Sequence, residues 1–252
     1  MKINNSYPGL YIVFEGIVGT GKSTQIKLLC DNLKTYSDDI STRLVFEPGG
    51  TSLADQIRKI VKYEKLTAEE EARLFAKARE SLLDEVVRPA LARGELVISD
   101  RSFLSSLAYQ GEGRLWDGGG QPLYKGWRGI WKQFNKEVLR ETMPDVIMFI
   151  DTSIAAARER SERDNPDKFD REGSGFWERT REGYLDVLFR LTCQYTGMSV
   201  VKIDDDGRLG KDEISRHVVR EVAPLIDSWL ANGEGRVHKE RQISSKERLV
   251  GV

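Results

Sequence analysis

The chain has 252 residues, of which 39% are hydrophobic and 9% aromatic, so it can bury a sizeable core as one large domain. Lysine and arginine total 39 against 40 aspartates and glutamates, and this balance gives no global attraction to nucleic acid or membrane. Its two cysteines, Cys30 and Cys193, lie outside any CxxC or Cys/His spacing, which disfavours a disulfide framework or zinc site. No signal pattern or membrane-length apolar run is present, so we expect a cytoplasmic protein.

Apolar runs rich in β-branched residues alternate with helical patterning along the chain. The predicted strands are Leu10–Glu15, Thr42–Phe46, Glu95–Ser99, Asp145–Ile150 and Ser199–Ile203. Thr67 and Glu70 form a capping box at the start of a longer helix that should end before Gly94, with a kink at Pro89. The alternation predicts an α/β fold with a parallel sheet, helices on both faces, and ligands at the carboxyl ends of the strands.

Two stretches depart from this alternation. Residues 111–129 combine glycines with Trp116, Tyr124 and Trp127, which indicates an inserted ordered loop with aromatic anchors. Residues 232–252 are charged and poor in large apolar side chains, as is typical of a frayed tail. We therefore expect a single domain over residues 1–231, followed by this tail.

Residues 16–23 read Gly-Ile-Val-Gly-Thr-Gly-Lys-Ser and match GxxxxGK[ST] between a strand and an amphipathic helix. The pattern predicts a P-loop NTPase fold in which backbone N–H groups surround ATP phosphates, Lys22 neutralises their charge and Ser23 binds Mg²⁺. A glycine-rich turn without nucleotide is the alternative. The expected ATP contacts in this segment are Gly16, Ile17, Val18, Gly19, Thr20, Gly21, Lys22, Ser23 and Thr24.

Three further segments distinguish among P-loop proteins. Residues 47–51 read Glu-Pro-Gly-Gly-Thr, Asp100-Arg101 follows the third strand, and residues 105–111 read Ser-Ser-Leu-Ala-Tyr-Gln-Gly. With these motifs the chain resembles the bacterial type of thymidylate kinase from Tyr11 to about Trp229. The resemblance implies magnesium-dependent transfer of a phosphoryl group from ATP to dTMP by a homodimer, with small nucleotides and no nucleic acid or membrane as partners.

The resemblance also implies roles for individual residues. Arg101 and Arg58 are expected to clamp the acceptor phosphate, and Asp100 to hold magnesium, with Glu15 as a further metal candidate. Phe75 would stack on thymine, Arg79 would reach a base carbonyl, and Tyr109 would crowd C2′ of the sugar. The full set of expected acceptor contacts is Glu47, Pro48, Arg58, Phe75, Arg79, Arg101, Ser105, Ser106, Tyr109 and Gln110. Without the resemblance, Phe75 would be read as a core residue. Asp100-Arg101 in isolation would be read as a surface ion pair, but its position after a strand favours a functional role.

Residues 158–181 are rich in arginine and resemble the mobile lid of the family. Family members without an arginine inside the P-loop use lid cations in catalysis, and residues 17–20 contain none. We expect Lys168 and Arg171 to act on the transferring phosphoryl group and Arg163 to contact ATP. A solvated, charged helix is the alternative reading.

Two residues depart from the family pattern. Val18 replaces the usual acidic P-loop residue that contacts the 3′-hydroxyl, and Phe46 replaces the arginine before the Glu-Pro-Gly-Gly-Thr turn. These departures leave open a deoxynucleoside kinase with Glu47 as general base. A non-catalytic nucleotide-binding module is a third possibility, although Lys22, Arg101 and the cationic lid argue against it.

Overall fold

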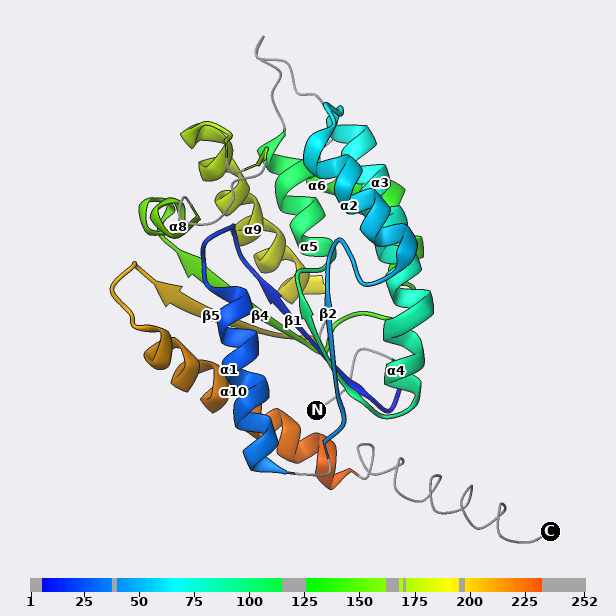
Figure 1. Ribbon diagram of the computed structural model, residues 1–252, viewed down its shortest axis with the longest axis vertical. Helices are drawn as coiled ribbons and strands as arrows, with labels where there is room; N and C mark the ends of the chain where they lie inside the picture. Colours follow the sequence, from blue (N-terminus) through cyan, green and yellow to red (C-terminus); the bar gives the residue numbers. More distant parts are fainter. Residues whose placement is uncertain are drawn as a thin grey trace, which may run out of the picture.

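A computed structural model describes residues 6–37, 40–114, 126–161, 168–169, 171–194 and 198–232. Its centre is a five-stranded parallel sheet with the strand order β2-β3-β1-β4-β5 (Figure 1). The strands are β1 (Leu10–Glu15), β2 (Thr42–Phe46), β3 (Leu96–Asp100), β4 (Val146–Thr152) and β5 (Ser199–Asp205). The predicted α/β fold with a parallel sheet is thus confirmed, and β3, β4 and β5 each extend one or two residues beyond their predicted carboxyl ends.

Helices connect the strands and cover both faces of the sheet. The α-helices are α1 (Lys22–Tyr36), α2 (Ser52–Tyr63), α3 (Ala68–Leu82), α4 (Arg88–Ala92), α5 (Phe103–Ser106), α6 (Gly126–Ile130), α7 (Lys136–Leu139), α8 (Ile154–Ser161), α9 (Ser174–Gln194) and α10 (Lys211–Ala231). The π-helical turns are η1 (Leu83–Val87), η2 (Leu107–Gly113) and η3 (Trp131–Asn135). None of the described helices has the length and hydrophobicity needed to cross a lipid bilayer.

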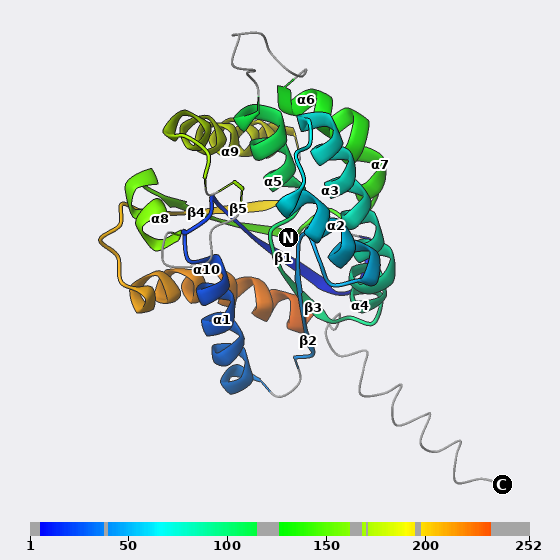
Figure 2. The same cartoon turned by 45° about the horizontal axis from the view of Figure 1, so that its top comes forward.

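Two apolar cores occupy opposite faces of the sheet because side chains alternate along each strand. On one face, Ile12 and Phe14 pack with α1 and α10. On the other, Tyr11 and Val13 pack with α5, η2 and α9. In the view with the top of the molecule turned forward, α5, α8 and α9 surround the carboxyl end of β1 (Figure 2).

The long helix expected from Thr67 to Gly94 is divided into α3, η1 and α4. Its start is confirmed, because Thr67 and Glu70 form both hydrogen bonds of the capping box. The π-helical turn η1 ends just before Pro89, which has no N–H to donate to the helical ladder.

The segment predicted to be an inserted loop is helical at both of its described ends. Gly111–Gly113 belong to η2, and Gly126–Gly129 belong to α6. Helical periodicity is weak in so glycine-rich a stretch, so the sequence hides these turns. The aromatic anchors Trp116 and Tyr124 and residues 233–252 of the expected tail lie outside the described residues.

Candidate functional site

The phosphate loop joins β1 to α1 at the carboxyl end of the sheet. Gly16, Gly19 and Gly21 have φ angles of 144°, 80° and 83°, which residues with side chains rarely adopt. A Cβ added at Gly19 would lie 1.9 Å from the carbonyl oxygen of Ala157, so α8 packs directly on the loop. Loop N–H groups and the N-terminus of α1 then form a site suited to anions.

Lys22 lies within this loop and is buried. Its Nζ donates hydrogen bonds to the carbonyl oxygens of Gly16 (3.0 Å) and Ile17 (2.8 Å). Burial and the nearby charge of Arg101 together lower the pKa of Lys22 to about 7, against the raising effects of Asp100 and Glu15. An anionic phosphate in the loop would favour the charged ammonium.

Ser23 and Asp100 meet at the mouth of the loop. The Ser23 hydroxyl donates a 2.5 Å hydrogen bond to Oδ2 of Asp100, although 77 residues separate them in sequence. Both groups offer oxygen atoms, the ligand type that Mg²⁺ prefers. Within the described residues, no cluster of three or more histidine, cysteine, aspartate or glutamate side chains could hold a metal. The two oxygen donors of Ser23 and Asp100 fit a magnesium ion whose remaining ligands would be phosphate oxygens and water.

Arg101 follows β3 in an unusual backbone conformation. Its φ of 75° is rare for a residue other than glycine, and such strain concentrates at functional sites. Its Nη1 donates to the carbonyl oxygen of Gly16 (3.1 Å) and to the Ser105 hydroxyl (3.1 Å). The guanidinium also stacks over Tyr109, at 5.3 Å from the ring centroid. The arginine expected to bind the acceptor phosphate is thus held beside the phosphate loop.

Glu15 is buried beneath Arg101. Its carboxylate accepts hydrogen bonds from the Ser102 N–H (2.8 Å), the Ser105 hydroxyl (2.8 Å) and the Tyr184 hydroxyl (3.0 Å). Burial raises the pKa of Glu15 to about 7, against the lowering effects of Arg101 and of these hydrogen bonds. Because three donors surround the carboxylate, the geometry disfavours Glu15 as a direct metal ligand and favours a role in holding the site together.

The Glu-Pro-Gly-Gly-Thr turn carries a buried ion pair. Oε2 of Glu47 accepts a 2.7 Å hydrogen bond from Nε of Arg79, and the two side chains are 5% and 1% exposed. Arg79 also donates to the Asn135 side chain, to the Ser102 carbonyl (3.2 Å) and to the Ser106 hydroxyl (3.1 Å). These hydrogen bonds fix the Arg79 side chain. Its guanidinium is paired with Glu47, the carboxylate that a nucleoside kinase would use as a general base.

Phe46, just before the same turn, packs against Arg58. The Arg58 guanidinium lies 5.3 Å from the centroid of its ring and donates a 2.9 Å hydrogen bond to the Pro48 carbonyl. A Cβ at Gly49 would lie 2.0 Å from the Phe46 ring, so only glycine allows this packing. The residue that departs from the family pattern thus positions Arg58.

An aromatic group lies beyond Arg101. The Phe169 ring is 6.4 Å from that of Phe75 and 5.9 Å from that of Tyr109, measured between centroids. The Tyr109 hydroxyl accepts a 3.1 Å hydrogen bond from the Val18 backbone N–H. Phe75, expected to stack on the base, and Tyr109, expected to pack on the sugar, therefore both lie close to Phe169, and Tyr109 also contacts the phosphate loop.

The expected lid cations differ in their surroundings. Lys168 forms a 2.9 Å ion pair with Glu71 and donates a 2.9 Å hydrogen bond to the Glu64 carbonyl. Arg171 is exposed, and Arg163 lies outside the described residues. At the edges of the lid, Arg181 forms a bidentate ion pair with Asp151. Arg160 donates a single hydrogen bond to the Asp205 carboxylate.

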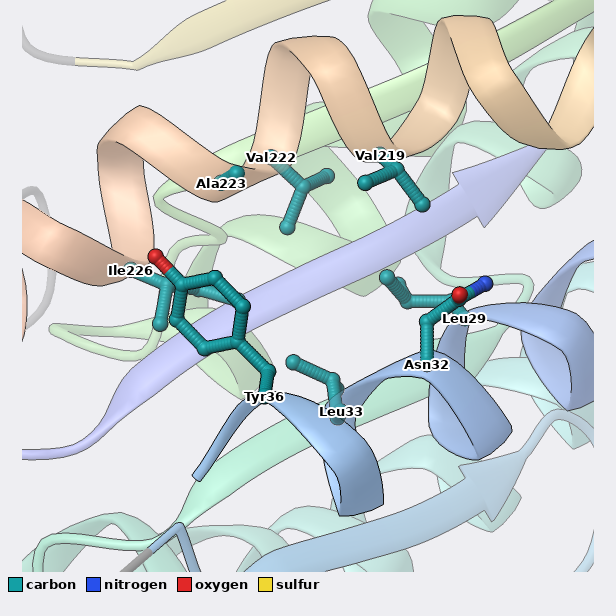
Figure 3. A pocket seen from close by; sticks show the side chains of 8 residues that line it. All are labelled: Leu29, Asn32, Leu33, Tyr36, Val219, Val222, Ala223 and Ile226. Atoms are coloured by element: carbon teal, nitrogen blue, oxygen red, sulfur yellow. The ribbon is translucent and has the colours of Figure 1, made fainter.

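An apolar groove lies between α1 and α10, away from these groups (Figure 3). It is lined by Leu29, Asn32, Leu33, Tyr36, Val219, Val222, Ala223 and Ile226. No cation lines it, so it does not suit a phosphorylated ligand.

Sequence reasoning missed several residues of the site. Tyr184 and Asn135 belong to no recognised motif, and only the fold brings them to Glu15 and Arg79. Glu71 was detectable, because an acidic residue on the apolar face of a helix requires a partner.

Comparisons with known proteins agree with this geometry. The family model described as thymidylate kinase matches residues 14–198. A thymidylate kinase of Desulforudis audaxviator is 42% identical over 71% of this chain and 77% of its own length, and that of Fervidobacterium nodosum is 34% identical over 84% and 97%.

A solved structure is also similar. The crystal structure of thymidylate kinase from Ehrlichia chaffeensis superposes with a TM-score of 0.64 at 25% identity, covering 85% of this chain and 98% of that one. A P-loop, an arginine beside it and these matches lead to one conclusion: the chain belongs to the thymidylate kinase family of nucleoside monophosphate kinases.

Proposed function

We propose that this protein transfers the γ-phosphoryl group of ATP to dTMP, giving dTDP and ADP. The observation that carries the proposal is the convergence at the end of β1 of Lys22, the Ser23–Asp100 pair and Arg101. Phosphoryl transfer needs mainly positioning and charge neutralisation, and this arrangement supplies both. The acceptor oxygen of a monophosphate is already anionic, so the reaction needs no general base.

The donor site consists of the phosphate loop. Residues 16–21 would enclose the phosphates with backbone N–H groups, and Lys22 would neutralise their β/γ charge. Ser23 and Asp100 would hold Mg²⁺, directly or through water, and the ion would supply further charge neutralisation.

The acceptor site follows from the positions around Arg101. Arg101 and Arg58 would bind the acceptor phosphate, and Phe75 would stack on the base. Ser105 and Ser106 hold Arg101 and Arg79 in place, as Glu47 does for Arg79. Arg79, Tyr109 and Gln110 complete the proposed contacts to base and sugar.

The lid completes the catalytic charges in this proposal. Arg171 is the better candidate for the cation at the transferring phosphoryl group, because it is exposed and Lys168 is engaged by Glu71. Lys168 stays a proposed contributor, and it reaches the phosphoryl group only after leaving that carboxylate.

Assembly and location are finer proposals. A homodimer is supported by exposed apolar side chains on α2, namely Leu53, Ile60 and Tyr63. A small nucleotide substrate is consistent with a cytoplasmic enzyme.

A coupled ADP-release assay tests the function directly. It would offer dTMP, dUMP, dCMP, dGMP and thymidine separately with ATP and Mg²⁺. We expect dTMP to give the highest kcat/KM. A clear preference for thymidine would favour the nucleoside-kinase alternative, and ADP release independent of every acceptor would reject the kinase proposal.

A further inference from the structure

Helix α3 presents charged residues on its buried face. Glu71, Phe75 and Arg79 are spaced four residues apart and so lie along one side of the helix. Glu71 is 1% exposed, yet it lies one turn from Phe75, the proposed stacking residue. A carboxylate so deeply buried is costly unless donors satisfy it.

Three donors from two other segments converge on Glu71. Lys168 Nζ lies 2.9 Å from Oε1, and Arg114 Nη2 lies 3.3 Å from the same atom. Gln110 Nε2 donates a 3.2 Å hydrogen bond to Oε2. One side chain thereby connects α3 to η2 and to the lid.

Arg114 extends this connection into the lid. Its Nη1 donates to the Glu172 carboxylate, and its guanidinium lies 5.5 Å from the Phe169 ring and 5.0 Å from the Phe176 ring. Phe169 is itself near Phe75. Loss of the Glu71 carboxylate would leave Arg114 with Glu172 and Lys168 with the Glu64 carbonyl, so it would weaken the anchoring of both cations and of the Phe169 ring between them.

The hydrogen bond between Glu71 and Gln110 also fixes the orientation of the Gln110 amide. An ionised carboxylate can only accept hydrogen bonds, so the amide NH₂ of Gln110 must face Glu71 and the amide carbonyl must point away. A fixed carbonyl can accept a hydrogen bond from a ring N–H. It cannot do so from a ring nitrogen that carries a lone pair.

We propose that Glu71 is a positioning residue that sets base selectivity by holding the Gln110 amide in one orientation and Lys168–Phe169 against the acceptor site. This inference rests on the proposed function, in which Gln110 contacts the base. Such a pocket selects pyrimidines with N3–H, as in thymine and uracil, over cytosine, whose N3 is an acceptor. Glu71 acts through Gln110 and does not itself touch the nucleotide.

The test compares Glu71→Gln with Glu69→Gln in the full-length enzyme. Glu69 is a matched control on the same turn of α3, because its carboxylate is 44% exposed and pairs only with Arg73 among the described ion pairs. A glutamine at position 71 can donate or accept, so the Gln110 amide becomes free to turn. For each protein, kcat and KM are measured for dTMP, dUMP, dCMP and ATP.

We expect Glu71→Gln to reduce the ratio of kcat/KM for dTMP over dCMP by roughly tenfold or more, mainly by raising KM for dTMP. KM for ATP should stay within about twofold, and Glu69→Gln should behave as wild type. If Glu71→Gln is poorly folded, Glu71→Asp keeps the charge but shortens the reach to Gln110, and it should lower the same ratio by a smaller factor.

Two results separate the possible failures. Equal losses for dTMP and dCMP, with an unchanged ratio, would show that Glu71 only stabilises the fold and would overturn the inference. A wild-type enzyme that does not act on dTMP would instead reject the proposed function, whatever the variants do.

Discussion

The hydroxyl of Tyr184, on α9, donates a 3.0 Å hydrogen bond to Oε2 of Glu15 and accepts one from Nη1 of Arg101 at 3.3 Å. Glu15 is the last residue of β1 and Arg101 directly follows the adjacent strand β3, so the tyrosine links the catalytic edge of the sheet to the helix that follows the lid. The phenol therefore lies between the Arg101 guanidinium and the Glu15 carboxylate and forms a hydrogen bond with each.

We therefore predict that Tyr184→Phe lowers kcat while preserving the fold. Loss of the hydroxyl leaves Glu15 one donor short and Arg101 less constrained, which typically costs about 1–3 kcal/mol, or roughly 5- to 150-fold if it falls on the rate. Steady-state kinetics with dTMP and ATP would measure it. Tyr63→Phe is the matched control, because Tyr63 is 74% exposed. Equal kcat values for the two variants would show that Tyr184 does not position Arg101.

A second prediction concerns the pH dependence of stability. Burial lowers the pKa of Lys22 to about 7 from 10.5, so between these values the unfolded chain keeps a proton that the folded protein has released. Stability from this group therefore rises as the pH increases from about 7 to 10.5, by about 1.4 kcal/mol per pH unit at most. Below pH 7 the charged, buried ammonium reduces stability.

Lys22→Met removes this titration. Urea unfolding of wild type and variant at pH 7.5 and pH 9.5, without nucleotide, should show the variant to be the more stable protein at pH 7.5 and the difference to shrink at pH 9.5. In this window Glu15, with a pKa of about 7, is largely ionised in both states. A difference independent of pH would contradict the lowered pKa. The same variant should lose phosphoryl transfer, because it cannot neutralise phosphate charge.

The sequence predicted the sheet well because each strand is a short apolar run between helical patterns. Leu10–Glu15 and Thr42–Phe46 were predicted to the residue. The π-helical turns η1, η2 and η3 could not be predicted, because an i to i+5 bonding pattern leaves no distinct hydrophobic period.

The site was predictable only where a motif fixes the backbone. The positions of residues 16–23 and of Asp100-Arg101 could be predicted, because each motif directly follows a predicted strand. In contrast, the partners of Arg79 come from three segments, and Asn135 lies 56 residues away from it. Contacts of this kind arise from packing, so spacing along the chain does not reveal them.

A third prediction separates the two lid cations. Lys168→Met should raise KM for dTMP and change kcat by less than about threefold, because Lys168 is bound to Glu71 beside the acceptor pocket. Arg171→Met should instead lower kcat by at least roughly tenfold, with little change in KM. Arg220→Met, an exposed change on α10, serves as the control. A large loss of kcat in Lys168→Met would make Lys168 the catalytic cation.

The last prediction concerns Val18 and the sugar. Val18 lies beside Tyr109, since its N–H donates to the tyrosine hydroxyl at 3.1 Å, and Tyr109 is the residue proposed to pack on the deoxyribose. A carboxylate at position 18 could accept a hydrogen bond from the 3′-hydroxyl, whereas valine cannot. We therefore expect wild-type enzyme to discriminate weakly against 3′-deoxy-dTMP. Val18→Asp should increase the kcat/KM preference for dTMP over 3′-deoxy-dTMP by about 1.5–3 kcal/mol, the typical range for a hydrogen bond to a charged group.

Val18→Asn is the control for this experiment, because it adds a polar side chain of similar size without the charge and should restore less of the preference. Competition assays with both acceptors at fixed ATP give the ratio directly and do not depend on the active fraction of each variant. An unchanged ratio in Val18→Asp would place the 3′-hydroxyl away from residue 18 and against another donor or acceptor. A lower kcat/KM for both acceptors by the same factor would mean that the new carboxylate repels the ATP phosphates, since residue 18 belongs to the loop proposed to enclose them.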